Sequence, residues 1–91
     1  MLAPHKVLPK LEQAVETLHA LREKRGEDWV ITTVIFSDTV LLAVASAHFY
    51  PSDIRDIEEA LEDVFEDFCI HVISAGGVVL LLIDTPELEE E

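Results

Sequence analysis

Residues 68–84 read FCIHVISAGGVVLLLID, and this stretch has the pattern of a complete β-hairpin. Two apolar runs, 68–75 and 78–84, flank Gly76 and Gly77, a pair able to adopt the positive φ values that tight hairpin turns require. The second run is apolar at every position from 78 to 83, and so is the run VLLAVA at 40–45. Strands that are apolar on both faces are typical of the buried middle of a sheet. The two runs therefore predict two central strands.

The other elements follow from spacing and from helix and strand terminators. Apolar positions at helical spacing predict a helix over 7–21, followed by a basic last turn and Gly26. Runs rich in β-branched and aromatic residues over 29–36 and 39–49 predict a first hairpin, with its turn at 37–38. Pro51 and Ser52 end that hairpin and begin a second helix. Its apolar stripe consists of Ile54, Ile57, Leu61, Val64, Phe65 and Phe68.

The resulting order is αββαββ, and the two halves resemble each other weakly at an offset of 39 to 40 residues, which suggests an internal repeat. Two αββ units can form one four-stranded antiparallel sheet with both helices on one face. The second strand of each unit is then central and the first is at an edge. This α+β layout is a circular permutation of the ferredoxin-like βαββαβ order. A profilin or roadblock type of sheet is the alternative, although it needs more strands and a last helix.

We expect residues 1–86 to form a single domain, because 91 residues leave no room for two cores. Residues 87–91 form an acidic tail that we expect to be disordered. The longest uninterrupted apolar runs have six residues, far short of the ~20 that a membrane-spanning helix needs. The N-terminal sequence MLAPHKVLPK lacks the apolar stretch of a secretory signal, and Cys69 is a single cysteine. We expect a cytoplasmic protein that does not enter a membrane.

Nearly all of the net charge of −13 belongs to the second half of the chain. Thirteen of the 19 acidic residues follow Tyr50, against one base, Arg55, whereas residues 1–50 carry six acids and five bases. The one basic cluster, Arg22 with Lys24 and Arg25, is explained by the negative end of the first helix. We therefore expect no direct binding of nucleic acid, whose phosphates require exposed Lys and Arg.

Apolar residues make up 49% of the chain, which is a high fraction for a small domain with a large relative surface. The helices can cover one face of the sheet, so the second apolar face of the central strands needs another cover. We expect a homodimer or larger assembly that forms through the sheet. A tail or first helix that wraps further round the sheet is the alternative. The candidate self-association residues are Leu42, Val44, Val79 and Leu81.

The second helix, read as DIRDIEEALEDVFEDF over 53–68, carries eight acids. Four pairs of acids lie four residues apart along it, and each pair costs about 0.2 to 0.5 kcal/mol in a helix. Such a face either keeps an apolar protein soluble or docks a basic partner protein. The candidate partner-binding residues are Glu58, Glu59, Glu62, Asp63 and Glu66.

Metal and catalytic patterns are weak. Cys69 and His71 project from the same strand face and His48 closes the other hairpin, but two ligands do not make a zinc site. The acidic tail lacks the spaced oxygen ligands of a calcium loop. Glycine-rich phosphate loops and nucleophile elbows are absent from the sequence, and carboxylates on a solvated helix lack the dry cleft of acid–base catalysis. We expect no metal, no cofactor and no enzymatic activity.

Two functional hypotheses remain. The first is a small acidic non-enzymatic interaction protein, an adaptor, inhibitor or chaperone-like factor. It would self-associate through its sheet and engage a basic partner with its acidic helix. The second is a metabolite-sensing regulatory module with a ligand site in a cleft between subunits. The concentration of acids on the second helix favours the first hypothesis, because a sensor has no need of them.

Overall fold

The computed structural model describes residues 4–36 and 39–86, and its helices and strands follow the predicted order. The elements are α1 (Pro4–Arg25), β1 (Val30–Phe36), β2 (Thr39–Ser46), α2 (Pro51–Glu62), β3 (Cys69–Ala75) and β4 (Val78–Asp84). The αββαββ order and the α+β class are therefore confirmed. The predicted acidic tail, 87–91, lies outside the described residues.

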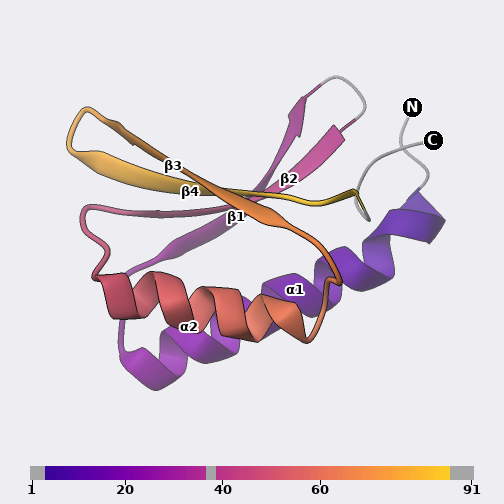
Figure 1. The fold of residues 1–91 in the computed structure, drawn as a ribbon, viewed down its shortest axis with the longest axis horizontal. Helices are drawn as coiled ribbons and strands as arrows, with labels where there is room; N and C mark the ends of the chain where they lie inside the picture. Colours follow the sequence, from indigo (N-terminus) through magenta and orange to yellow (C-terminus); the bar gives the residue numbers. More distant parts are fainter. Residues whose placement is uncertain (1–3, 37–38, 87–91) are drawn as a thin grey trace.

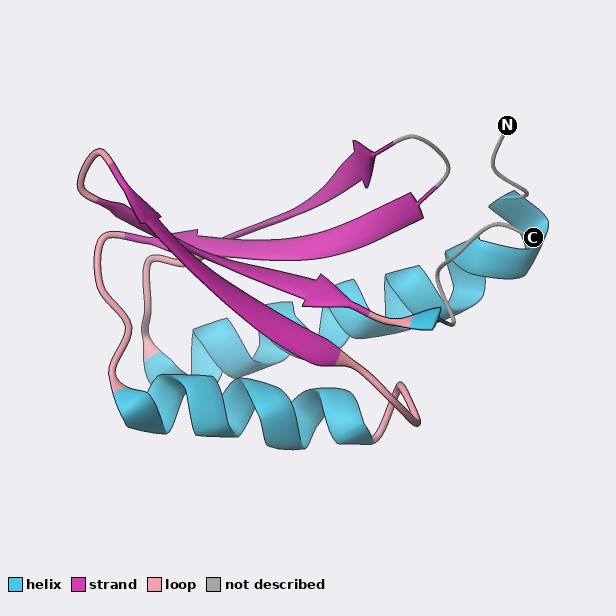
Figure 2. Cartoon of the chain, turned by 45° about the horizontal axis from the view of Figure 1, so that its top comes forward, coloured by secondary structure: helices cyan, strands magenta, loops and turns pink. Residues whose placement is uncertain are grey.

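The four strands form one antiparallel sheet in the order β1-β2-β4-β3. The doubly apolar strands β2 and β4 are central, and β1 and β3 are the edges, as their compositions predict. This strand order is compatible with a circular permutation of the ferredoxin-like fold. Figures 1 and 2 show that α1 and α2 lie side by side on the same side of the sheet, so no helix of the described residues lies on the other side.

The two hairpins pair in equivalent registers. Val30 lies opposite Ala45 in the first hairpin, and the residues 39 positions further along, Cys69 and Asp84, lie opposite each other in the second. The tight turn of the second hairpin is made by Gly76 and Gly77, at φ values of 59° and 79°. These positive values are those that a two-residue turn of this kind needs and that glycine adopts without strain.

The core lies between the helices and the covered face of the sheet. Trp29, which precedes β1, is buried at 1% exposure and packs against Phe49, with ring centroids 5.9 Å apart. The helices and strands contribute the rest of the buried cluster. Its other members are Ala14, Leu18, Val40, Leu42, Val44, Ile57, Leu61, Val64, Phe65, Leu81 and Ile83.

The second helix is shorter than its apolar stripe predicts. It ends at Glu62, not at Phe68. The amides of Val64 and Phe65 both donate to the carbonyl of Leu61, at 2.9 and 2.8 Å, and so close its last turn. Both of these side chains are buried, and Lys10 Nζ of α1 donates to the carbonyl of Val64 at 3.1 Å. The apolar spacing therefore predicts correctly that Val64 and Phe65 are buried, but it overestimates the length of the helix.

The first hairpin is also shorter than predicted, since β2 ends at Ser46 and a loop runs to Tyr50. The helix that follows is not capped by Ser52. Its N-cap is Tyr50, whose backbone N–H donates to the carboxylate of Asp53 at 2.9 Å. An acid three residues after the N-cap satisfies one of the free amides at this helix end.

Candidate functional site

The predicted partner-binding residues are all exposed. Glu58, Glu59 and Glu62 lie on the solvent side of α2, opposite the buried Ile57 and Leu61. Asp63 caps the helix and Glu66 lies in the turn after it. We call these acids the acidic face, and its members are Glu58, Glu59, Glu62, Asp63 and Glu66.

The early end of α2 removes part of the like-charge repulsion that the sequence predicts. Glu58 and Glu62 are one turn apart on the helix, but Glu66 and Asp67 lie beyond its end. Two of the four pairs of acids spaced four residues apart, Glu62–Glu66 and Asp63–Asp67, are therefore not helical neighbours. The acids after residue 62 lie on either side of Val64 and Phe65 in the chain, and those two side chains are buried.

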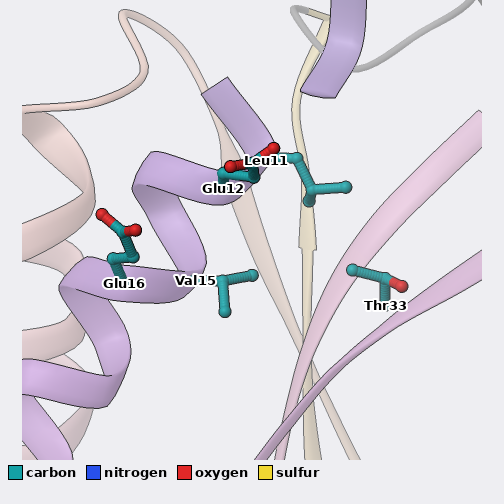
Figure 3. A pocket seen from close by; sticks show the side chains of 5 residues that line it. All are labelled: Leu11, Glu12, Val15, Glu16 and Thr33. Atoms are coloured by element: carbon teal, nitrogen blue, oxygen red, sulfur yellow. The ribbon is translucent and has the colours of Figure 1, made fainter. Parts of the chain in front are cut away.

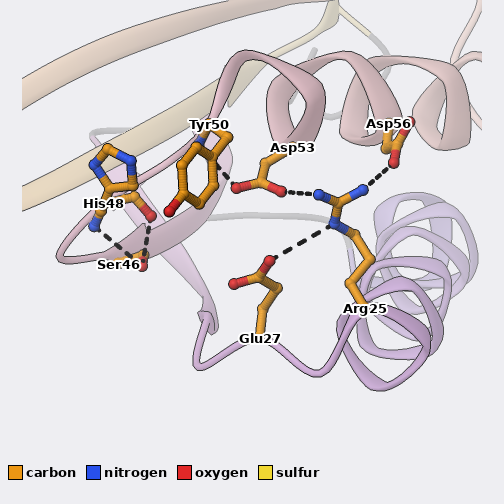
Figure 4. Close-up of polar contacts among 7 residues, drawn as sticks. All are labelled: Arg25, Glu27, Ser46, His48, Tyr50, Asp53 and Asp56. Atoms are coloured by element: carbon orange, nitrogen blue, oxygen red, sulfur yellow. Dashed lines mark hydrogen bonds and ion pairs between the residues drawn. The ribbon is translucent and has the colours of Figure 1, made fainter.

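Three of the eight acids of this segment, Asp53, Asp56 and Asp67, do not belong to the acidic face, and the first two pair within the fold. Figure 4 shows the guanidinium of Arg25, at the end of α1, between Asp53 and Asp56 of α2. Asp53 is 0% exposed, and Arg25 Nε also lies 3.8 Å from Glu27 Oε2. Arg25 thus joins the ends of the two helices, a role that its position in a basic last turn does not reveal. The neighbouring Arg22 donates to the carbonyl of Trp29 at 3.2 Å.

The loop before α2 brings a serine and a histidine together without forming a catalytic pair. Ser46 Oγ donates to the carbonyl of His48 at 3.0 Å and accepts its backbone N–H at 3.3 Å. The imidazole of His48 instead makes an edge contact with the ring of Tyr50, with centroids 4.4 Å apart (Figure 4). In a catalytic pair, a hydrogen bond joins the side chains of the nucleophile and its base. Here the Ser46 hydroxyl bonds to the backbone of His48, so the contact orders the loop.

The weak metal pattern is not completed by the fold. Cys69 and His71 share a face of β3, as predicted, and His71 Nε2 lies 4.0 Å from Asp84 Oδ2. His48 follows Ser46, which is in register with Val79 at the opposite end of β4 from Asp84. Among residues 4–36 and 39–86, no group of three or more His, Cys, Asp or Glu side chains is placed to hold a metal ion.

Neither of the described helices is long and apolar enough to cross a membrane.

An open pocket of about 320 Å³ lies between α1 and β1. Figure 3 shows Leu11 and Val15 of α1 pointing toward Thr33 of β1, whereas Glu16 points away. Glu12 completes the lining. The pocket is a shallow gap on the helix side of the sheet, and it contains none of the candidate partner-binding residues.

The predicted self-association residues require a correction. Leu42, Val44 and Leu81 are 0% exposed in the core under the helices, and Val79 shares that covered face. None of them lies on the face that carries no helix, because side chains alternate between the two faces along a strand. The sequence shows that both faces are apolar but does not show which one the helices cover.

The side of the sheet away from the helices is covered by no helix or strand of the described residues, and we call it the open face. Ala43 at its centre is buried, and Thr32 and Leu82 lie opposite it in the adjacent strands. Its other described residues, strand by strand, are Val30 and Val34; Leu41 and Ala45; Val78, Leu80 and Asp84; and Cys69, His71, Ile73 and Ala75.

Comparisons of the chain with protein-family models, with curated proteins and with solved structures find no match. The functional inference therefore depends on the surfaces that the chain itself presents.

Proposed function

We propose that this chain is a small acidic non-enzymatic interaction protein that engages a basic partner protein through the acidic face and self-associates through its sheet. The observation that carries the proposal is the separation of two unlike surfaces. Acidic side chains gather on the helical layer, and an apolar surface lies on the opposite side of the sheet. Each kind of surface suits a different kind of partner.

The acids of α2 divide into structural and exposed groups. Asp53 and Asp56 are compensated by Arg25 within the fold. In contrast, no ion pair among the described residues joins Glu58, Glu59, Glu62 or Asp63 to a cation, and all four are exposed. Uncompensated charge of one sign attracts a partner of the opposite sign and accelerates its association. The acidic face is therefore the surface that we assign to a basic protein.

A matched pair of charge variants tests this assignment. The first changes Glu58, Glu59 and Glu62 to Gln and Asp63 to Asn, and leaves Glu66 intact because it interacts within the chain. The control changes the exposed acids of the first half in the same way, at Glu12, Glu16, Glu23 and Asp28. Both variants lose four negative charges, so they differ only in where the charge is removed.

The measurement is a pull-down from the native host with wild type and both variants, at low and high salt. We expect a basic protein that wild type and the control retain, that the acidic-face variant loses, and that high salt releases, since exposed charges are screened over about 8 Å at physiological ionic strength. Equal binding by both variants would overturn the assignment. A small molecule that co-purifies with the protein, with no basic partner, would favour the metabolite-sensing alternative.

A further inference from the structure

The open face is apolar over most of its extent and is only partly shielded by its own side chains. At its edges and hairpin end, Val30, Ile73 and Val78 are 60%, 44% and 46% exposed. Toward the centre, Leu80 and Leu82 are partly exposed. A soluble monomer rarely leaves a contiguous apolar surface of this kind uncovered.

We infer that a second copy of this chain covers the open face, with the two sheets stacked face to face. This inference rests on the self-association in the proposed function and specifies its surface. An isologous pair uses the same patch on both copies, so each open face covers the other. The centre of the contact would be Ala43 and Leu82, which lie opposite each other in the two central strands.

The dimensions of the sheet agree with such a contact. Four strands about 4.8 Å apart and about 23 Å long cover roughly 400 Å² in projection. Side chains make the accessible surface larger than its projection, so two copies together approach the ~1,000 Å² that a specific interface needs. Twisted antiparallel sheets stack face to face at a separation of about 10 Å, with strand directions about 30° apart.

The distribution of charge selects a second copy over a charged partner. Among the described residues of the open face, Asp84 is the only acid, Lys and Arg do not occur, and His71 lies beside Asp84 at 4.0 Å. Face-to-face stacking points both helical layers outward, which separates the two acidic faces by more than about 20 Å. That distance exceeds the screening length of about 8 Å, so two chains of charge −13 can approach through this side.

Adjacent residues of β3 provide a matched test of the face that is used. Ile73 lies on the open face at 44% exposure, and Val72 lies on the helix side of the same edge strand at 56% exposure. Ile73→Lys and Val72→Lys make nearly the same chemical change, and each lowers the net negative charge. Leu82→Lys places the same charge at the centre of the open face. Circular dichroism establishes that each variant is folded, and sedimentation equilibrium at micromolar concentration, without any partner, gives its association state.

We expect a wild-type dimer, a dimer for Val72→Lys, and folded monomers or at least tenfold weaker association for Ile73→Lys and Leu82→Lys. A monomeric wild type would overturn the inference, and so would a Leu82→Lys variant that dimerises as strongly as wild type. Equal weakening by Val72→Lys and Ile73→Lys, with no effect of Leu82→Lys, would indicate pairing through the β3 edge instead. Because no partner is present, these outcomes are independent of whether the acidic face binds a basic protein.

Discussion

Arg25, the last residue of α1, pairs with Asp53 in the first turn of α2. The carboxylate of Asp53 is fully buried, and its second oxygen accepts the backbone N–H of Tyr50 at 2.9 Å. One acid therefore begins α2 and fixes it to the preceding helix. This pair shows that the acids of the second half do not form one group: those near the start of α2 stabilise the fold, and those further along face the solvent.

We predict that Arg25→Ala lowers the free energy of unfolding by about 3 kcal/mol. The substitution leaves the buried Asp53 without its cation, and breaking one partner of a buried pair usually costs that much. Urea denaturation followed by circular dichroism measures the change. The matched control is Lys24→Ala, one residue earlier and exposed, which should change stability by less than about 0.5 kcal/mol. Similar effects of the two substitutions would show that the pair contributes nothing specific.

We predict that Leu42→Asp and Leu81→Asp prevent folding, whereas the open-face variant Leu82→Lys does not. Both Leu42 and Leu81 are 0% exposed in the core, so either aspartate would be a buried, unpaired charge. The cost of about 4 kcal/mol or more is a large part of the 5 to 15 kcal/mol that stabilises a typical domain. Circular dichroism and thermal melting measure the effect. A folded Leu81→Asp monomer would contradict the assignment of β4 side chains to the two faces.

We predict that Glu62→Gln leaves the stability unchanged or raises it by up to about 0.5 kcal/mol. Glu62 is at the end of α2, where the helix dipole disfavours an acid, and it is one turn from Glu58. Differential scanning calorimetry at low salt measures the shift. Glu59→Gln is a useful comparison, because Glu59 is further from the helix end. A clear loss of stability in Glu62→Gln would mean that this carboxylate has a structural role.

Much of the architecture could be predicted because it depends on local patterns. The doubly apolar runs at 40–45 and 78–83 identify the central strands, and Gly76 with Gly77 identifies the tight hairpin. The exposure of the acidic face also follows from helical spacing, since Glu58, Glu59 and Glu62 lie opposite the apolar stripe.

The remaining features depend on contacts between distant parts of the chain. Burial of Val64 and Phe65 continues at helical spacing after the helix itself has ended, so the apolar pattern does not reveal the end of α2. The pairing of Arg25 with Asp53 joins residues 28 positions apart. A strand that is apolar on both faces likewise gives no signal of which face the helices cover, so the sequence does not distinguish core residues such as Leu42 and Leu81 from residues of the opposite face.

Sedimentation equilibrium of the wild-type chain over a range of salt concentrations shows whether two copies associate and whether the contact is apolar or ionic. If two copies meet through the apolar open face while their acidic faces point outward, the protein should be dimeric at micromolar concentration. Its association should be at least as strong at high salt as at low salt, because salt screens the residual repulsion and does not weaken apolar contact. A monomer at every salt concentration, or a dimer that dissociates steeply as salt is added, would contradict the account.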